Sequence, residues 1–510
     1  MNRSRYLETQ GWQQPATEKT IRAVLSFGCH LNMDSKRVIN NSIALLVMDL
    51  SGKVVPLVTF PWIVRALGPE SYGKVGFATA VCGFFGLLAS PGFTAYGVRE
   101  AARAEEPPRK LVQKLMSARI MLAAASFALL VVFTFTLAPR DWMTRLLLLI
   151  TGTSFLVASV DVQWLYMGHS KMWRVSSATI LAQFVYMAII LATVRRSADA
   201  WIVPLAVTVS AIFTAFLLLN RARADFNIGL PRYMPEEWGT FLPICVTLGV
   251  ASMMSMIYDQ IDTVMLRYLR SEAEVGLYVA SYRLMAISMS FLSVLVQVFY
   301  PLFSGSARGD TQKNKQYVQW MANNTIALAL PISIGGFVLA KPICALVMGA
   351  RYAGAEHLMR WLMLNLLSAS AAVLFTSRLV PSNRERQYLW SVAAGALANI
   401  ILNFIFIPRY GAIAAVFTTI AAQTTVAAIA YYFTRDLHRA KFVRPILISL
   451  LASVVMAGTI IAVERVVNLH VVILIIGGAA IYGATMFILQ RAWKQPIDPS
   501  VVAAGSGGPE

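Results

Sequence analysis

The sequence predicts an all-α polytopic membrane protein with about fourteen transmembrane helices. The chain has 510 residues, of which 57% are hydrophobic and 14% charged, whereas a soluble domain carries about 25% charged residues. Apolar stretches recur along the whole chain, and each is close to the roughly 20 residues that a helix needs to cross a bilayer. Stretches such as FALLVVFTFTLA lack the alternation that marks a transmembrane β-strand.

The predicted spans form two lobes and a C-terminal helix pair. Residues 38–222 are an N-lobe of six spans, 236–434 a C-lobe of six, and 444–490 the extra pair. Residues 1–37 are predicted to be a cytoplasmic arm and 491–510 a cytoplasmic tail. The predicted spans are 39–64, 74–98, 115–137, 146–167, 176–194, 201–220, 238–264, 275–303, 319–340, 358–380, 388–407, 411–433, 445–464 and 471–490.

The positive charge of the chain follows this topology. The net charge is +19, and a strongly basic chain could bind nucleic acid. When the N-terminus is placed in the cytoplasm, however, the segments on that side carry about twice as many Lys and Arg residues as the other side, as the positive-inside rule requires. The sequence therefore predicts both termini in the cytoplasm and no nucleic-acid partner.

The segment GPESYGKV at 68–75 resembles a phosphate-binding P-loop but lacks its essential features. A P-loop has Ser or Thr after its lysine, to bind magnesium, and it connects a strand to a helix. Here Val75 follows Lys74, and the segment connects the first two predicted spans on the outer side of the membrane. Gly68, Pro69 and Gly73 instead predict a tight turn between two helices.

A second copy of this turn predicts an internal repeat. IVRALGPESYGKVGFATA at 63–80 resembles MLRYLRSEAEVGLYVASY at 265–282, and the second copy lacks the lysine that a nucleotide site would need. Because six spans precede the second half, the halves have the same orientation and are expected to be related by an axis along the membrane normal. The matching residues are Arg65, Leu67, Glu70 and Gly73 in the first copy and Arg267, Leu269, Glu272 and Gly276 in the second.

Basic side chains in the predicted spans are candidates for binding an anionic substrate. A charge at the bilayer centre costs about 2.5–3.5 kcal/mol on insertion scales, so such residues usually line a wet cavity or form pairs. Lys53 lies in span one, Arg283 in span eight and Arg119 at the start of span three. Cations of this kind bind phosphate. Alternatively, Lys53 forms a structural pair with Asp49, Arg283 extends to the outer interface and Arg119 is interfacial.

Four carboxylates are candidates for coupling transport to an ion gradient. Asp259 and Asp262 lie on nearly one face of span seven, and Asp49 lies one turn before Lys53 in span one. Asp161 lies near the inner end of span four. Because the repeat makes spans one and seven equivalent, their charged faces are expected to meet across a central cavity and to bind a proton or sodium ion there. Alternatively, Asp262 is solvated at the outer end and Asp161 is interfacial.

No catalytic or metal-binding pattern is found in the sequence. The four cysteines and five histidines are scattered and lack metal-ligand spacing, so we expect no metal, no cofactor and no enzymatic activity. Aromatic side chains could stack on sugar rings in the cavity, or they could belong to the belts at the membrane interfaces. The aromatic residues in question are Tyr258, Trp164 and Tyr282.

Three segments of the sequence resemble parts of one family of membrane proteins. NNSIALLVMDLSGKVVPLVTFPWIVRALGPESYGKVGFATAV resembles their first hairpin, and DTVMLRYLRSEAEVGLYVASYRL their second-half hairpin. DVQWLYMGHSKMWR resembles their acidic-x-x-Trp-aromatic-x-Gly signature. The family that these segments resemble is the Wzx-type O-antigen and polysaccharide flippases of the multidrug/oligosaccharidyl-lipid/polysaccharide superfamily, and the resemblance covers spans one to about nine.

This resemblance implies the substrate, the location and the driving force. The expected substrate is an undecaprenyl-diphosphate-linked oligosaccharide, the repeat unit of an O-antigen or exopolysaccharide, which is moved across the bacterial inner membrane. The expected architecture is two six-helix lobes around a cationic cavity, driven by an H⁺ or Na⁺ gradient. Expected partners are the lipid-linked oligosaccharide, the bilayer and the polysaccharide polymerase machinery.

Three alternatives remain open on the sequence alone. Fourteen spans, where many Wzx-type proteins have twelve, are similar to the lipid II flippase branch. A multidrug/cation antiporter of the same superfamily should favour carboxylates over cations in its cavity. A membrane glycosyltransferase or polymerase should have a large outer loop with catalytic residues, whereas the longest one here, KPICALVMGARYAGAEH, is short and partly apolar.

Overall fold

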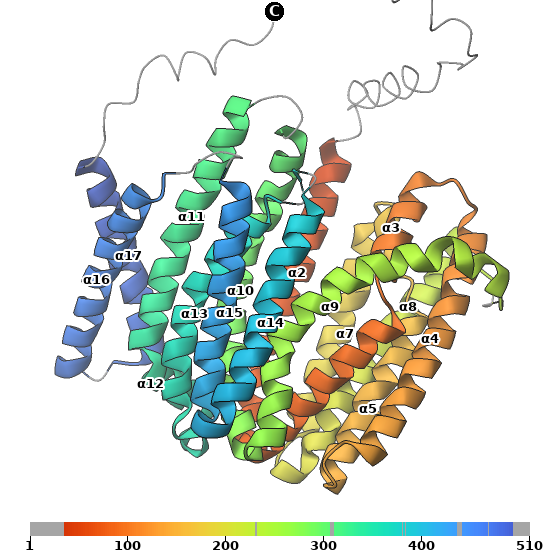
Figure 1. The fold of residues 1–510 in the computed structure, drawn as a ribbon, viewed down its shortest axis with the longest axis horizontal. Helices are drawn as coiled ribbons and strands as arrows, with labels where there is room; N and C mark the ends of the chain where they lie inside the picture. The colour runs from red at the N-terminus through yellow and green to blue at the C-terminus, as the bar shows by residue number, and fades with distance from the viewer. Residues whose placement is uncertain are drawn as a thin grey trace, which may run out of the picture.

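The computed structural model describes most of the chain as helices. The described residues are 35–229, 232–306, 311–379, 381–382, 384–435, 441–467 and 469–492. Within these ranges, side chains are described except at 35–51, 53–54, 251–252, 258, 293–306 and 311–314. The first and last described helices place their free ends on the same side of the molecule, at the top of Figure 1. We call this the terminal side and the opposite end the hairpin side.

The N-lobe is a bundle of helices at the right of Figure 1. Within it, α2 contacts α4, α5 and α7, and α8 contacts α5 and α7. Two clusters of buried apolar side chains form its core, one around Phe77 and Leu147 and the other around Phe93 and Trp164. Its elements are α2 (Ser35–Ala89), α3 (Phe93–Arg103), α4 (Pro108–Thr136), α5 (Trp142–Ser159), α6 (Gln163–Gly168), α7 (Met172–Thr193), the 3-10 helix η1 (Ser197–Trp201) and α8 (Ile202–Phe226).

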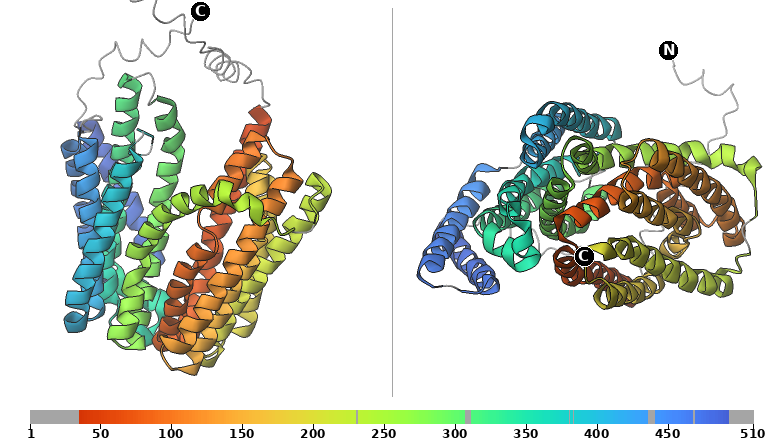
Figure 2. Two further views of the ribbon diagram at one scale, coloured as in Figure 1. Left: turned by 45° about the vertical axis from the view of Figure 1, so that its right-hand side comes forward. Right: turned by 90° about the horizontal axis from the view of Figure 1, so that it is seen from below.

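The C-lobe and the extra helix pair occupy the centre and left of the same view, with the pair at the edge (Figures 1 and 2). The pair contacts the C-lobe through α11. The elements after α8 are η2 (Pro235–Glu237), α9 (Trp238–Leu269), α10 (Glu272–Ser306), α11 (Thr311–Val338), α12 (Ala340–Met348), η3 (Ala350–Tyr352), α13 (Ala355–Thr376), α14 (Glu385–Tyr410), α15 (Ala412–Thr434), and the pair α16 (Val443–Val466) and α17 (Val471–Ala492).

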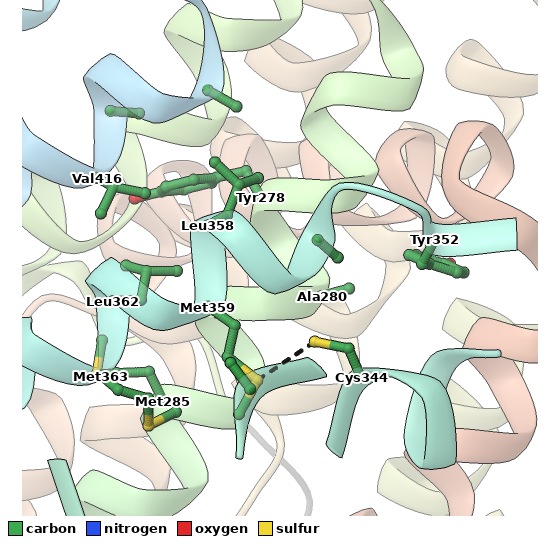
Figure 3. Packing of buried hydrophobic residues seen from close by; sticks show 14 of the residues in the cluster. Tyr278, Ala280, Met285, Cys344, Tyr352, Leu358, Met359, Leu362, Met363 and Val416 are labelled. Atoms are coloured by element: carbon green, nitrogen blue, oxygen red, sulfur yellow. Dashed lines mark hydrogen bonds between the residues drawn. The ribbon is translucent and has the colours of Figure 1, made fainter. Parts of the chain in front are cut away.

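The core of the C-lobe is apolar and rich in sulfur-containing side chains. Figure 3 shows Met285, Met359 and Met363 packed around Leu362, with the thiol of Cys344 3.3 Å from the sulfur of Met359. Methionine fills irregular gaps between helices because its side chain is unbranched and flexible. This core fixes α10 and α13 against each other.

The number of membrane-crossing helices agrees with the sequence. Thirteen helices in the described ranges are long and apolar enough to cross a bilayer. The first of them, Val55–Ala89, includes parts of two predicted spans, because α2 contains a non-helical residue, Gly68, at which the chain turns back (Figure 1). Gly68 has a φ of 74°, in the left-handed region that favours glycine. The prediction of an all-α polytopic fold with about fourteen spans is therefore confirmed.

The two predicted hairpin turns pack directly against each other on the hairpin side. A Cβ atom added to Gly73 would lie 2.2 Å from the backbone oxygen of Glu272, and one added to Gly276 would lie 1.8 Å from that of Pro69. The two contacts are equivalent, because Glu272 lies one helical turn before Gly276 and Pro69 lies one helical turn before Gly73. Such reciprocal contacts are what a twofold axis between equivalent elements produces. The repeat predicted from the sequence is thus visible as a contact between backbones.

One helix, α9, connects the two lobes. Its first turn lies against the N-lobe, where the indole nitrogen of Trp238 donates a hydrogen bond to Ser117 on α4 at 3.0 Å. Its second half contacts α14 in the C-lobe. Figure 1 shows α9 crossing the molecule between these two positions. Residue 236, the predicted start of the C-lobe, lies in η2 directly before this helix, which contacts both lobes.

We expect Gly276→Ala to destabilise the protein. The added methyl group would overlap the backbone at Pro69, which cannot move as a flexible side chain would, and overpacking typically costs about 1–3 kcal/mol. Thermal unfolding of the purified protein should therefore occur at a lower temperature. Gly458→Ala on α16 is the matched control, because nothing lies within 4 Å of the position its Cβ would take. Equal melting temperatures for the two variants would contradict close packing of the hairpins.

Candidate functional site

A cavity of about 550 Å³ lies between the two lobes. The N-lobe contributes residues of α2, α7 and α8 to its lining, and the C-lobe contributes residues of α9 and α10. Gly76 and Val279 line the cavity and also face each other in the contact between the hairpins. The packed hairpins therefore close the cavity toward the hairpin side.

Two of the predicted site residues lie in this cavity and bring opposite charges to it. Arg283 on α10 and Asp259 on α9 both line it. Among the described lining residues, Arg283 is the one basic side chain and Asp259 the one acidic side chain. The hydroxyl of Tyr282 donates a hydrogen bond to Asp259 Oδ1 at 3.4 Å. Arg283 is exposed rather than enclosed in the protein core. Its guanidinium is therefore accessible to a ligand in the cavity.

Hydroxyl, amide and aromatic groups make up most of the remaining polar lining. Tyr282 was expected here, and the structure adds Tyr72, Tyr186, Gln183 and Gln260 to it. Rings and hydrogen-bonding groups of this kind suit a polar ligand with apolar faces, such as a sugar. In the sequence, Gln183 and Tyr186 lie three residues apart in an otherwise apolar span. This spacing places both on one helical face and could have indicated the cavity.

Further small hydroxyl residues complete the lining. The hydroxyl of Thr179 is buried and has no hydrogen-bond partner among the described residues. A buried polar group without a partner costs about 1–3 kcal/mol, so a ligand that bonded to it would recover this energy. The other lining hydroxyl residues are Thr59, Thr79, Ser210, Thr214 and Thr263.

Asp262 is buried within the C-lobe at the centre of a hydrogen-bond network. Its carboxylate accepts hydrogen bonds from the hydroxyls of Tyr278 at 2.7 Å and Thr419 at 2.5 Å, and from the amide of Asn403. Asn403 in turn donates to Asn399 at 3.1 Å. Since Asp262 is only 1% exposed, solvation at the outer end does not describe its environment. Partners from α10, α14 and α15 satisfy a group that would otherwise be costly to bury.

Arg119 and Asp161 lie together, but neither is among the residues that line the cavity. The guanidinium of Arg119 donates to the backbone oxygen of Asp161 at 2.8 Å and to that of Ala158. The Ala158 carbonyl lies in the last turn of α5 and the Asp161 carbonyl just beyond it, where carbonyls lack the usual intrahelical partners. The carboxylate of Asp161 accepts from the backbone N–H of Gln163 at 3.1 Å. This pair stabilises the connection between α5 and α6.

The remaining candidates differ in how far the structure describes them. The side chains of Asp49, Lys53 and Tyr258 lie outside the described part of the chain, so their roles stay predictions. Trp164 is fully buried, and its indole donates to the backbone oxygen of Asp161 at 3.1 Å. It therefore packs within the N-lobe core instead of facing the cavity.

An ion-pair cluster joins the lobes on the hairpin side. Lys74 lies 2.9 Å from Asp141 of the N-lobe and 3.2 Å from Glu272 of the C-lobe. Burial raises the pKa of Asp141, but hydrogen bonds from Lys74 and Thr144 outweigh this effect and hold that pKa below its usual range. Lys74, which resembled a P-loop lysine, thus binds two carboxylates of its own chain.

The sequence matches a family model and several named relatives. The model is described as polysaccharide biosynthesis protein, and it matches residues 38–307. A protein of Escherichia coli K12 named as an O-antigen transporter is 20% identical over 415 residues, which cover 80% of this chain and 99% of that protein. The succinoglycan biosynthesis transport protein ExoT of Rhizobium meliloti is 22% identical over 368 residues, 71% of each chain.

Solved structures share the fold. A lipid II flippase MurJ in an inward closed conformation superimposes with a TM-score of 0.67 at 15% identity, covering 89% of this chain and 99% of that one. An inward-facing multidrug resistance transporter of the MATE family gives a TM-score of 0.60 at 12% identity, covering 75% of this chain and 94% of that one. At these identities the similarity establishes the arrangement of helices.

We expect Arg119→Ala to reduce folding of the protein. Removing the guanidinium takes a charged donor away from two carbonyls. The Asp161 carbonyl then keeps the bond from the Trp164 indole, and the Ala158 carbonyl keeps the bond from the backbone N–H of Asp161, but losing a hydrogen bond from a charged group costs about 1.5–3 kcal/mol. The amount of folded protein in the membrane and its melting temperature should both fall. Arg109→Ala on the same helix is the control, because Arg109 is exposed. A stable Arg119→Ala protein with impaired substrate binding would instead favour a direct role in the site.

Proposed function

The chain belongs to the polysaccharide biosynthesis protein family, and we propose that it is a flippase for an undecaprenyl-diphosphate-linked oligosaccharide in the bacterial inner membrane. Membership in this family bears out the resemblance to Wzx-type flippases, and the apolar helices make the chain a multi-pass membrane transporter. The names of the relatives, an O-antigen transporter and a succinoglycan transport protein, support a polysaccharide repeat unit as the substrate.

The observation that carries this proposal is the composition of the central cavity. A diphosphate-linked sugar needs a cation for its phosphates and hydrogen-bonding and aromatic groups for its sugar rings. Arg283 supplies the first, and Tyr72, Tyr186 and Gln183 are among the groups that supply the second. The polyprenyl tail is apolar and needs no polar cavity, so it can remain in the bilayer while the headgroup crosses.

The proposed transport cycle alternates access to this cavity from the two sides of the membrane. In the state described here, the packed hairpins and the Lys74 cluster hold the lobes together on the hairpin side. With the termini in the cytoplasm, as the positive-inside rule favours, this closed side faces outward. For the headgroup to leave outward, the two hairpins must separate, so that Gly73 moves away from Glu272 and Gly276 away from Pro69.

We assign ion coupling to Asp262 and its neighbours. Asn399, Asn403 and Thr419 surround its carboxylate with amide and hydroxyl groups whose oxygens can hold a sodium ion, while the carboxylate alone can bind a proton. No group of three His, Cys, Asp or Glu residues is placed to bind a metal within the described ranges, so this network is distinct from a transition-metal site. Neutralising Asp262 would weaken its bonds to three helices and thereby favour their rearrangement.

We expect Arg283→Ala to abolish surface polysaccharide while the protein stays in the membrane at its normal level. The cavity would lose its described cation, and the diphosphate would lose its partner. The measurement is complementation of a deletion strain, with immunoblots of the membrane fraction and Arg386→Ala, an exposed arginine outside the cavity, as control. Normal surface polymer with Arg283→Ala would contradict the proposed substrate. So would a variant that loses drug resistance but keeps its surface polymer.

We expect Asp262→Asn to remove the response of flipping to an ion gradient. The substitution keeps the shape of the side chain but removes the charge that binds the ion. Flipping would be measured in proteoliposomes, once with an imposed proton gradient and once with an imposed sodium gradient. One of the two gradients should increase the flipping rate of the unmodified protein. Asp199→Asn, at a partly exposed ion pair with Arg196, serves as the control. A gradient response retained by Asp262→Asn would rule out its coupling role.

A further inference from the structure

A second cavity, of about 1080 Å³, lies between α11 of the C-lobe and the helix pair α16 and α17. It is on the terminal side, since it is lined by the first turns of α11 and α16 and the last turns of α17. It shares no lining residue with the central cavity in the part of the chain that the structure describes. We call it the terminal-side cleft.

The terminal-side cleft is strongly cationic. Lys315, Lys441 and Arg444 line it, and its described lining includes no Asp or Glu. Lys315 and Lys441 are exposed, and neither forms an ion pair with any described residue. Positive charges that converge on one cleft without a carboxylate attract an anion.

A set of hydrogen bonds around Gln319 holds one wall of the cleft in place. The side-chain amide of Gln319 on α11 donates to the backbone oxygen of Lys441 at 2.9 Å and accepts from its backbone N–H at 2.6 Å. Gln319 also donates to Asn323 at 2.7 Å. These bonds fix the backbone of Lys441 beside α11. The fold therefore holds the backbone of Lys441 where its ammonium group can reach the cleft.

The cleft has an exposed tryptophan at its edge and an apolar floor. Trp320, which lines it, is 54% exposed, and an exposed tryptophan near a helix end is typical of the membrane interface. Deeper in the cleft lie Ala327, Ile448 and Met486. There the hydroxyl of Tyr482 on α17 bonds to the backbone oxygen of Ala327 at 2.7 Å and ties α17 to α11.

We propose that the terminal-side cleft binds the phosphate-bearing headgroup of a lipid in the cytoplasmic leaflet. Lys315, Lys441 and Arg444 would contact the phosphate, and the amides of Gln316, Asn323 and Gln490 would contact its polar substituents. The apolar floor would receive the first carbons of the tail. The assignment to the cytoplasmic leaflet rests on the orientation in the proposed function. The same phosphate chemistry fits an anionic phospholipid and a polyprenyl diphosphate that waits outside the central cavity.

The test compares lipid binding to the full chain by native mass spectrometry. Purified protein is titrated with phosphatidylglycerol in one arm and with undecaprenyl diphosphate in the other. Both arms use an Arg283→Ala background, so that a failure of the central cavity does not register as a failure of the cleft. The variant is Lys315→Gln with Lys441→Gln, and the control is Arg109→Gln with Arg386→Gln, which removes two exposed charges from helix ends on the same side.

Each basic side chain near an anionic lipid contributes about fivefold to binding, so the double variant should bind about twenty-five-fold more weakly while the control stays unchanged. A loss confined to one arm would identify the lipid, and a loss in both would establish a shared phosphate site. Unchanged binding in both arms, or an equal loss in the control, would overturn the proposal. A photoreactive residue in place of Gln490 should also form a lipid adduct, and its absence would count against the cleft even if the charge variants were unstable.

Discussion

The close contact between the two hairpins is the constraint on which the rest of the structure depends. Gly73 and Gly276 allow the backbones of α2 and α10 to approach to a distance that no side chain would permit. This contact aligns the two lobes, forms the closed end of the central cavity and brings Lys74 within reach of carboxylates from both lobes. Because it involves equivalent residues of a repeat, the same local sequence builds both halves of the interface.

Ionisable residues of the predicted spans are used in three different ways. Arg283 faces the cavity, where its charge is available to a ligand. Arg119 donates to backbone carbonyls at the end of α5 and stabilises the N-lobe. Asp262 is enclosed by hydroxyl and amide donors from three other helices. In each case the cost of placing a charged group in an apolar bundle is offset by a different partner: a ligand in the cavity, the backbone, or neighbouring side chains.

The central cavity and the terminal-side cleft apply the same chemistry to different parts of the membrane. Both combine basic groups with amides, and both leave the apolar part of a lipid to apolar surroundings. The cleft exists only because the extra helix pair packs beside α11. This gives the pair a role in lipid recognition at the membrane interface, separate from the translocation path between the lobes.

The sequence by itself determined the fold class, the approximate number of spans and the repeat, because apolar length, turn residues and charges in spans are local properties. For the same reason it marked Arg283 and Asp259 as candidates for the cavity that they line. It did not distinguish Arg119 from Arg283, and it did not reveal the enclosure of Asp262 by Asn403 and Thr419. Those partners lie 141 and 157 residues away along the chain. Only the packing of helices decides which face of a span meets a cavity, a carbonyl or another side chain, since a helix presents residues to all sides and its neighbours select among them.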